Sequence, residues 1–298
     1  ATGHVDYINT SIGVATASLF MIEASMHIPP GYAMFIPSAI RQAVDLPVVG
    51  VGRFKDPLQA ERALAEGQCD LVGVVRGRNP KLAPLVVGAH YDHWGWGGEG
   101  SLYRGKDSAI HNGADDNASG VAAVLELAYR LKLAKLQRSV IVVAFSGEEQ
   151  GLWGSNDLAK KLAALPVKPA AMVNMDMVGR LGATRQLALY GVGTSPAWPT
   201  ALAAAGAADR FRLKIDSSGV GPSDHTSFYL TDVPVLHLFT GQHADYHQPS
   251  DDAHLINYEG LAEVVELVEA VIRDLDSRPE IQFTKTKSST SDTPRFKV

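Results

Sequence analysis

Histidine and carboxylate side chains that could bind a metal ion recur between positions 90 and 247, and most of them follow an apolar segment. They are His90, Asp116, Glu148, Glu149, Asp176 and His247. Imidazole and carboxylate ligands without a thiolate suit zinc or a similar divalent ion. Cys69 is the only cysteine of the sequence, so a cysteine-based zinc site is excluded. We therefore expect a metal site built from histidine and carboxylate groups.

The number of these ligands indicates two ions rather than one. A single catalytic zinc usually takes three protein ligands and a water, and two histidines with three carboxylates exceed that number. Such a set fits two ions, roughly 3.5–4 Å apart, that share a bridging carboxylate. The pair Glu148 and Glu149 then has two uses, because one carboxylate binds metal and the other is free to act as a general base.

Apolar segments that alternate with helical patterns must position these residues. Strands are predicted over residues 85–89, 139–146, 170–175, 186–190 and 233–239, and helices over 118–136, 152–165, 196–205 and 258–275. This alternation predicts an α/β fold. Binding sites in open α/β sheets form at the carboxyl ends of strands, and His90, Glu148 and Asp176 each follow a predicted strand. The convergence of strand ends on metal ligands is the strongest functional signal in the sequence.

Six motifs in these loops are similar to those of the co-catalytic zinc aminopeptidases, a family that also contains glutamate carboxypeptidase-like and glutaminyl-cyclase-like members. The motifs are GAHYDH, NGADDNASG, FSGEEQGLWGS, NMDMVGR, GPSDHTSF and DYHQPSDD. Each is weak alone, but all six occur in the family's order over about residues 80–275. The resemblance implies a three-layer α/β/α sandwich with a mixed, mostly parallel sheet, and two Zn²⁺ ions as cofactors.

The same resemblance implies a role for each residue of the site. The implied ligands are His90 and Asp176 for one zinc, Glu149 and His247 for the other, and Asp116 as a bridge that is followed by a cis peptide. Glu148 is implied as the general base, and Tyr246 as a group that helps to hold the oxyanion. Asp92 would orient the imidazole of His90 as a supporting carboxylate, and Asp115 would support or cap. Asp224 and His225 are expected to line the pocket or to support the ligands.

The activity that the resemblance implies is hydrolysis of N-terminal residues from peptides. The two zincs would lower the pKa of a shared water, and Glu148 would take its proton and pass it to the leaving amine. A carboxypeptidase or a glutaminyl cyclase is the alternative within the family. A complete set of five ligands with a base favours two-metal hydrolysis over cyclisation. The sequence leaves the residue preference and the oligomeric state open.

Residues 1 to about 79 have a different pattern, in which three short strands alternate with helices as in a βαβαβ unit. The segment DLPVVGVGRFKDPLQAERALAEGQCDLVGVVRG resembles the last βα units of the flavin-dependent old yellow enzyme and dienoyl-CoA reductase barrels. That resemblance implies that Gly52, Arg53 and Arg76 lie where such enzymes hold the flavin phosphate. It covers about a quarter of a barrel, and a barrel that lacks most of its strands cannot close. We therefore expect a structural fragment of a TIM barrel without a flavin.

Three parts are thus predicted, and the chain looks like a fusion or chimera. They are the barrel-like segment 1–79, a zinc peptidase domain over 80–276 and a polar, disordered tail over 277–298. The run LVGVVRGRNP at residues 71–80 fits either the last barrel strand or an early strand of the peptidase domain. A flavin-type oxidoreductase and an inactive scaffold are the competing functions.

The composition gives no reason to expect nucleic acid or a membrane as a partner. The net charge is −5, and 46% of the residues are hydrophobic and 20% charged, as in ordinary globular proteins. No segment approaches the roughly 20 apolar residues of a membrane span. The sequence starts at Ala1 without a signal-peptide pattern. The compartment stays open, although the peptidase part resembles secreted or periplasmic bacterial enzymes, and a peptide is the expected substrate.

Overall fold

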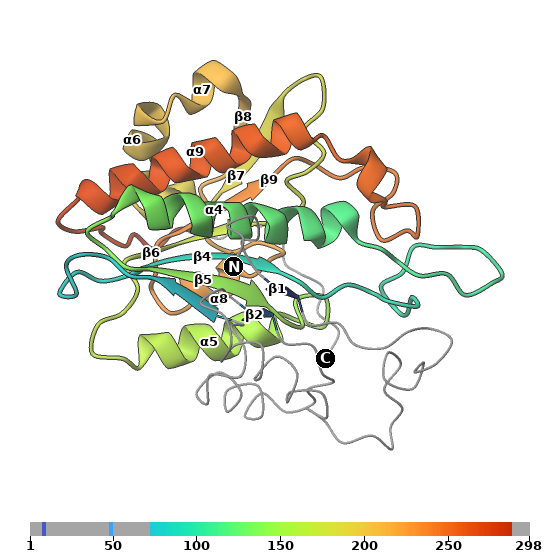
Figure 1. The fold of residues 1–298 in the computed structure, drawn as a ribbon, viewed down its shortest axis with the longest axis horizontal. Helices are drawn as coiled ribbons and strands as arrows, with labels where there is room; N and C mark the ends of the chain where they lie inside the picture. The colour runs from blue at the N-terminus through green and yellow to red at the C-terminus, as the bar shows by residue number, and fades with distance from the viewer. Residues whose placement is uncertain (1–7, 10–47, 50–71, 288–298) are drawn as a thin grey trace. The chain divides into compact units, whose positions relative to one another are not determined.

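The computed structural model describes residues 8–9, 48–49 and 72–287 (Figure 1). The chain divides into two compact units, Ala1–Gly73 and Val74–Val298. In the first unit, β1 (Ile8–Asn9) and β2 (Val48–Val49) pair in parallel, as the βαβ pattern predicts. Most of the predicted barrel fragment, including Gly52 and Arg53, lies outside the described residues, whereas residues 72–79 are described.

A seven-stranded sheet forms the centre of the second unit, in the order β3-β5-β4-β6-β9-β7-β8. Its strands are β3 (Val72–Val75), β4 (Leu85–His90), β5 (Val140–Phe145), β6 (Ala171–Met175), β7 (Gln186–Tyr190), β8 (Arg212–Ile215) and β9 (Val235–Phe239). The pair β7 and β9 is antiparallel, whereas β4–β5, β4–β6, β6–β9 and β7–β8 are parallel. The sheet is therefore mixed and mostly parallel, which confirms the predicted fold class.

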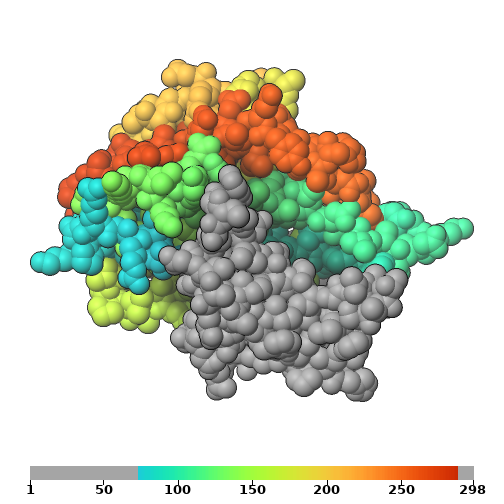
Figure 2. Space-filling model, viewed as in Figure 1, coloured from blue at the N-terminus to red at the C-terminus, as the bar shows by residue number. Residues whose placement is uncertain are grey.

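Helices cover both faces of this sheet, so the unit has three layers. The helices are α4 (Gly120–Ala134), α5 (Trp153–Ala163), α6 (Ala197–Ala204), α7 (Ala207–Arg210), α8 (His225–Tyr229) and α9 (Tyr258–Ser277). Figure 1 shows α4 and α9 side by side over one face, and α5 on the opposite face. In the space-filling view, α9 forms an orange-red ridge beside α4 (Figure 2).

The apolar pattern of each element explains this layering. All six residues of β4 and all five of β6 are buried, as expected for central strands that are covered on both faces. Helix α9 buries Leu261, Val264, Val265, Val268 and Ile272, which recur at the three- and four-residue spacing of one helical face. The helix starts at a cap in which the Asn257 side chain accepts a hydrogen bond from the Gly260 amide at 3.0 Å.

Two boundaries differ from the sequence prediction. Strand β3 belongs to the large sheet, so a boundary at residue 79 falls too late, and the exposed Arg76 follows a strand of this sheet. The predicted disordered tail is wrong for residues 278–287. There the Thr284 amide bonds to the Thr194 carbonyl at 2.8 Å and the Tyr229 hydroxyl to the Thr286 carbonyl at 3.1 Å. Residues 288–298 lie outside the described part.

None of the helices in the described residues combines the length and the apolar character that crossing a membrane requires.

Candidate metal centre

The parallel strands bring the predicted ligands to one edge of the sheet. His90 is the last residue of β4 and pairs with Phe145, the last residue of β5. Glu148 and Glu149 follow β5 after a short turn, and Asp176 follows β6 directly. Since β4 is parallel to both β5 and β6, all of these residues leave the sheet at its carboxyl edge, where α/β folds place their sites.

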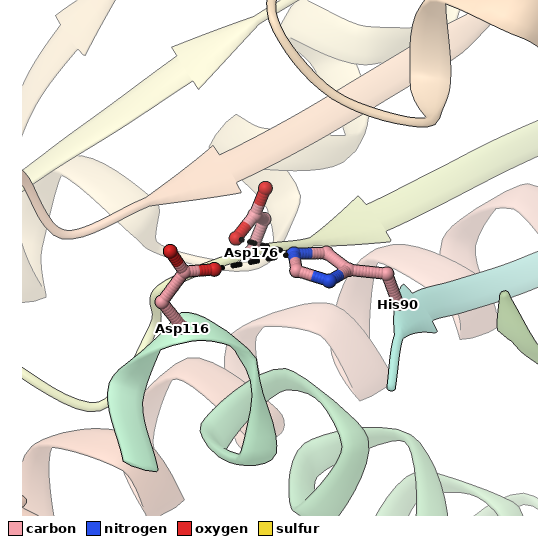
Figure 3. A group of neighbouring side chains, drawn as sticks. All are labelled: His90, Asp116 and Asp176. Carbon is pink, nitrogen blue, oxygen red and sulfur yellow. Dashed lines mark hydrogen bonds and ion pairs between the residues drawn. The ribbon is translucent and has the colours of Figure 1, made fainter. Parts of the chain in front are cut away.

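The first cluster consists of His90, Asp116 and Asp176. His90 Nε2 lies 3.3 Å from Asp176 Oδ1 and 3.4 Å from Asp116 Oδ1, and Figure 3 shows both carboxylates directed at this nitrogen. Only 1% of the His90 side chain is exposed. Burial lowers the pKa of His90, but Asp176 and Asp116 outweigh burial and raise it well above its ordinary value. The cluster therefore favours a positive charge at Nε2.

The second cluster consists of His247, Asp116 and Glu149. His247 Nε2 lies 3.2 Å from Asp116 Oδ2 and 3.4 Å from Glu149 Oε2. Burial lowers the pKa of His247, but hydrogen bonds with Asp116 and Glu149 raise it to about 10. The two oxygens of Asp116 thus face different histidines, which is the arrangement of a bridging ligand.

These distances and donor types fit zinc. Four donors at about 2.0–2.1 Å from a tetrahedral zinc lie roughly 3.3 Å from one another, and each histidine nitrogen has its two carboxylate oxygens at 3.2–3.4 Å. Imidazole and carboxylate are ligands that zinc accepts. The pKa values of His90 and His247 are raised by the same carboxylates. A group of carboxylates that attracts protons to these histidines also attracts a divalent cation in place of the protons.

Glu148 and Glu149 sit in different electrostatic surroundings although they are adjacent. Burial, together with Asp176, outweighs the opposing effect of His90 and raises the pKa of Glu148 well above its ordinary value. Burial also raises the pKa of Glu149, but hydrogen bonds from His247 and His93 hold it at about 2. Glu149 is therefore ionised, whereas Glu148 is a carboxylate that readily accepts a proton.

The role predicted for Asp92 is corrected by the structure. His90 Nδ1 contacts the backbone carbonyl of Asp92 at 3.0 Å, and the Asp92 carboxylate is 3.8 Å from that nitrogen. The carboxylate instead accepts hydrogen bonds from the amides of Glu148 at 3.1 Å and Glu149 at 3.3 Å. Asp92 thus orients His90 with its backbone and holds the two glutamates with its side chain.

Asp116 lies in η1 (Ala114–Ser119), and its position is fixed by neighbouring polar groups. The peptide between Asp116 and Asn117 is cis, as the resemblance implied. One carboxylate oxygen of the buried Asp251 accepts the amides of Asp115 at 2.8 Å and Asp116 at 3.1 Å. Asp115 accepts the amide of Gly179 at 2.7 Å, so it supports the site as predicted.

The loop between β4 and η1 holds His247 from outside. This loop extends away from the sheet in Figure 1 and forms the teal-green projection in Figure 2. His247 Nδ1 donates to the Gly100 carbonyl at 2.8 Å, and the Trp94 ring is 5.6 Å from the His247 ring. Tyr246 stacks on His247 at 3.8 Å. Burial and the surrounding carboxylates raise the pKa of Tyr246, so its hydroxyl keeps its proton.

Three residues near the ligands were not predicted from the sequence. His93 contacts Glu149, His243 contacts Asp115 Oδ2 at 3.2 Å, and Asp251 binds the amides described above. The motif HYDH at residues 90–93 already contained a signal for His93, since it places a second histidine three residues after the first. The contact of His243 depends on tertiary folding and has no local signal, whereas Asp251 lies within the motif DYHQPSDD.

Asp224 and His225 lie behind the ligands and do not line an open pocket, because both are fully buried. The ring of His225 stacks on that of His237 at 4.4 Å. The adjacent Ser223 donates a hydrogen bond to Asp176 Oδ2 at 2.8 Å. This segment therefore supports the first cluster from the interior.

Comparison with known proteins also assigns the part of the chain that contains these clusters to a peptidase family. The family described as Peptidase family M28 matches residues 70–272. A probable zinc metalloprotease of Pyrenophora tritici-repentis (strain Pt-1C-BFP) is 38% identical over 109 residues, which is 37% of this chain and 24% of the relative. Aminopeptidase YwaD of Bacillus subtilis (strain 168) is 26% identical over 242 residues, with 75% and 49% coverage. The chain thus spans half or less of the length of these curated relatives.

Solved structures share the fold. BSAP, a zinc aminopeptidase from Bacillus subtilis, matches with a TM-score of 0.56 at 25% identity, covering 71% of this chain and 50% of that one. A Bacteroides thetaiotaomicron glutaminyl cyclase bound to N-acetylhistamine matches with a TM-score of 0.57 at 19% identity, covering 68% and 76%. These comparisons give no support to the flavin-barrel resemblance. The family match extends from residue 70 through all six predicted ligand and base residues, so the chain belongs to peptidase family M28.

Proposed function

We propose that this protein is a zinc-dependent aminopeptidase that removes N-terminal residues from peptides. The observation that carries the proposal is the shared position of Asp116, whose two oxygens face His90 and His247 at 3.4 and 3.2 Å. This geometry supports two metal positions that share one bridging carboxylate. Membership in a peptidase family and the names of the relatives, zinc metalloprotease and aminopeptidase, support the same function.

Two zinc ions are the proposed cofactors. His90 and Asp176 would hold one ion and His247 and Glu149 the other, with Asp116 between them. When bound, zinc supplies Lewis-acid chemistry, because it acidifies water and polarises a carbonyl.

Glu148 is the proposed general base and acid. Its backbone amide is held by Asp92, and its carboxylate interacts electrostatically with His90, Asp176 and Glu149. The elevated pKa of Glu148 matches the task, since a carboxylate whose pKa is raised accepts a proton from water more readily than an ordinary glutamate does. Glu148 would accept the proton of the attacking water and donate it to the amine that leaves, so that it ends each cycle unprotonated.

Tyr246 is the proposed donor to the developing oxyanion. Its hydroxyl stays protonated because burial and the nearby carboxylates raise its pKa, and its ring is fixed against His247. A neutral donor that is positioned before the reaction stabilises charge without reorganisation.

Hydrolysis of leucine p-nitroanilide tests the proposal. We expect cleavage that a chelator abolishes and zinc restores, and N-acetyl-leucine p-nitroanilide should resist cleavage because an aminopeptidase needs the free amine. Glu148→Gln should lower kcat by roughly 10²–10⁴-fold, the usual contribution of a general base, with the bound zinc retained. Equal cleavage of both substrates would contradict the aminopeptidase assignment.

Cyclisation of N-terminal glutamine is the second candidate, because the Bacteroides glutaminyl cyclase shares the fold. Release of ammonia from a glutaminyl peptide, without cleavage of leucine p-nitroanilide, would favour it. A C-terminally amidated peptide separates a carboxypeptidase, since amidation would block that enzyme and leave an aminopeptidase unaffected.

A further inference from the structure

His93 lies inside the proposed metal centre but has no role in the account above. Its Nδ1 is 2.9 Å from Glu149 Oε1 and 3.9 Å from Asp116 Oδ2, and only 9% of its side chain is exposed. His93, Asp116 and Glu149 together could hold a metal ion. His93 is therefore either a further ligand or a group that acts on a ligand.

The distances separate these two roles. His247 Nε2 faces Oε2 of Glu149 at 3.4 Å, a separation typical of two donors on one tetrahedral zinc. His93 Nδ1 faces the opposite oxygen, Oε1, at 2.9 Å, the usual length of an N–H···O hydrogen bond. Its 3.9 Å separation from Asp116 Oδ2 is longer than the histidine–carboxylate spacings of the two clusters, which are 3.2–3.4 Å. The geometry is that of a hydrogen bond to a ligand.

The proton on this hydrogen bond can be assigned. A carboxylate that binds a metal ion does so in its ionised form. An ionised carboxylate only accepts hydrogen bonds, so Nδ1 of His93 must be the donor.

The ring of His93 is also held in place. It packs edge-on against the His247 ring, with centroids 5.8 Å apart. A Cβ at Gly113, where φ is +60°, would come within 2.7 Å of the His93 ring. The backbone thus closes tightly over the imidazole, which restricts its rotation.

We propose that His93 is a positioning residue that donates Nδ1–H to Glu149 Oε1 and leaves only Oε2 to the metal. The inference rests on the proposed function, because it needs a metal at Glu149, His247 and Asp116. Bonding partners of metal-ligating groups fix their orientation, and a single ligating oxygen keeps one coordination place open for substrate. His93 should therefore set the affinity of this metal position and leave the position at His90 and Asp176 unchanged.

Zinc dissociation constants of three variants test the role. His93→Ala removes the donor and should weaken one of the two zinc positions by roughly 10–100-fold, the usual effect of losing such a partner. His93→Asn places an amide N–H where Nδ1 lies, and it should restore the affinity to within about threefold, well inside that loss. His254→Ala is the matched control, since His254 is exposed in η3 (Ala253–Leu255). Circular dichroism of the zinc-free proteins checks that each variant folds.

Direct ligation is tested by NMR of the protein labelled with ¹⁵N-histidine and loaded with ¹¹³Cd²⁺. Scalar coupling to cadmium should appear for His90 and His247 only. Coupling to His93 would make it a ligand and overturn the proposal, as would unchanged zinc affinities in His93→Ala. A wild-type protein that binds no metal would instead overturn the proposed function. Wild-type binding of two ions together with an unaffected His93→Ala overturns this inference alone.

Discussion

At the scale of single residues, the site depends on how Asp116 is held. Its carboxylate contacts both histidines, so a small displacement of Asp116 would disturb both proposed metal positions. Asp251 fixes the backbone of this turn by accepting the amides of Asp115 and Asp116, and Asn117 ties the same turn to β6 through the Met175 carbonyl at 3.0 Å. The backbone that carries the proposed bridging carboxylate is therefore held by contacts that do not involve a metal.

The titration of His247 predicts how the stability of the zinc-free protein depends on pH. Its pKa is about 10 in the folded protein, against an ordinary value of about 6.5. The bound proton therefore stabilises the fold fully below pH ~6.5, and this contribution is lost as the pH rises through about 10. Burial raises the pKa of Asp224 to about 7. The stability that its bound proton contributes is therefore also lost as the pH rises, but through about pH 7.

Thermal melts of the zinc-free protein between pH 7.5 and 9.5 check this prediction. The melting temperature should fall across the range, and His247→Ala should flatten the curve. The zinc-loaded protein should not show the fall, because zinc binds the neutral imidazole. A melting temperature of zinc-free protein that rises with pH would contradict the assigned shift.

At the scale of elements, the loop from β4 to η1 is the part that reaches across to His247. Gly100 supplies the carbonyl for His247 Nδ1, and a Cβ at Gly100 would overlap the indole ring of Trp94. Gly100→Ala should therefore displace either Trp94 or the carbonyl.

We expect Gly100→Ala to weaken zinc binding at the His247 position by roughly 10–100-fold, as loss of a bonding partner of a ligand usually does, and to cost about 1–3 kcal/mol from overpacking. Gly182→Ala is the matched control, because a Cβ there has open space. Zinc titration against a chelating dye measures the difference. Equal affinities in both variants would show that this loop does not hold the ligand.

The long apolar elements were predictable from the sequence, and the short ones were not. Strand β7 has the predicted bounds, and α9 extends two residues beyond its predicted end. Strand β8, with four residues of which three are exposed, and α8, with five residues, were missed. Their formation depends on pairing with β7 and on burial against the sheet, and neither leaves a periodic pattern in so few residues.

The motifs predicted which side chains lie close together in the structure, but sequence reasoning failed where a contact joins distant segments. The structure brings His90, Asp116, Glu149, Asp176 and His247 together, with Glu148 beside them. The Asp92 carboxylate was assigned to His90, two residues away, but it bonds to amides 56 and 57 residues away. Sequence spacing cannot indicate which strand end lies next to a given loop.

At the scale of the whole molecule, the start of the peptidase unit is a testable boundary. The sheet includes β3. The residues that follow β3 form backbone hydrogen bonds with the residues that precede β5. The Arg78 amide bonds to the Leu136 carbonyl at 3.0 Å and the Asn79 amide to the Gln137 carbonyl at 2.9 Å. These bonds belong to the unit that the family match covers from residue 70.

A chain that starts at residue 70 should therefore keep the melting temperature of its peptidase unit, and one that starts at residue 80 should melt lower. Each kcal/mol lost lowers the melting temperature by roughly 2–4 °C in a domain of this size. Calorimetry of both chains beside the full-length protein makes the comparison. Identical melting of the two shortened chains would place the boundary after β3.

The number of zinc ions bound per chain tests the central claim most directly. Elemental analysis after equilibrium dialysis against zinc, with Asp116→Ala as the comparison, gives this number. The account predicts two zinc ions per wild-type chain and weaker binding at both positions in Asp116→Ala. A folded wild-type protein with no zinc, or with a single ion that survives the loss of Asp116, would contradict a two-metal site that shares this carboxylate.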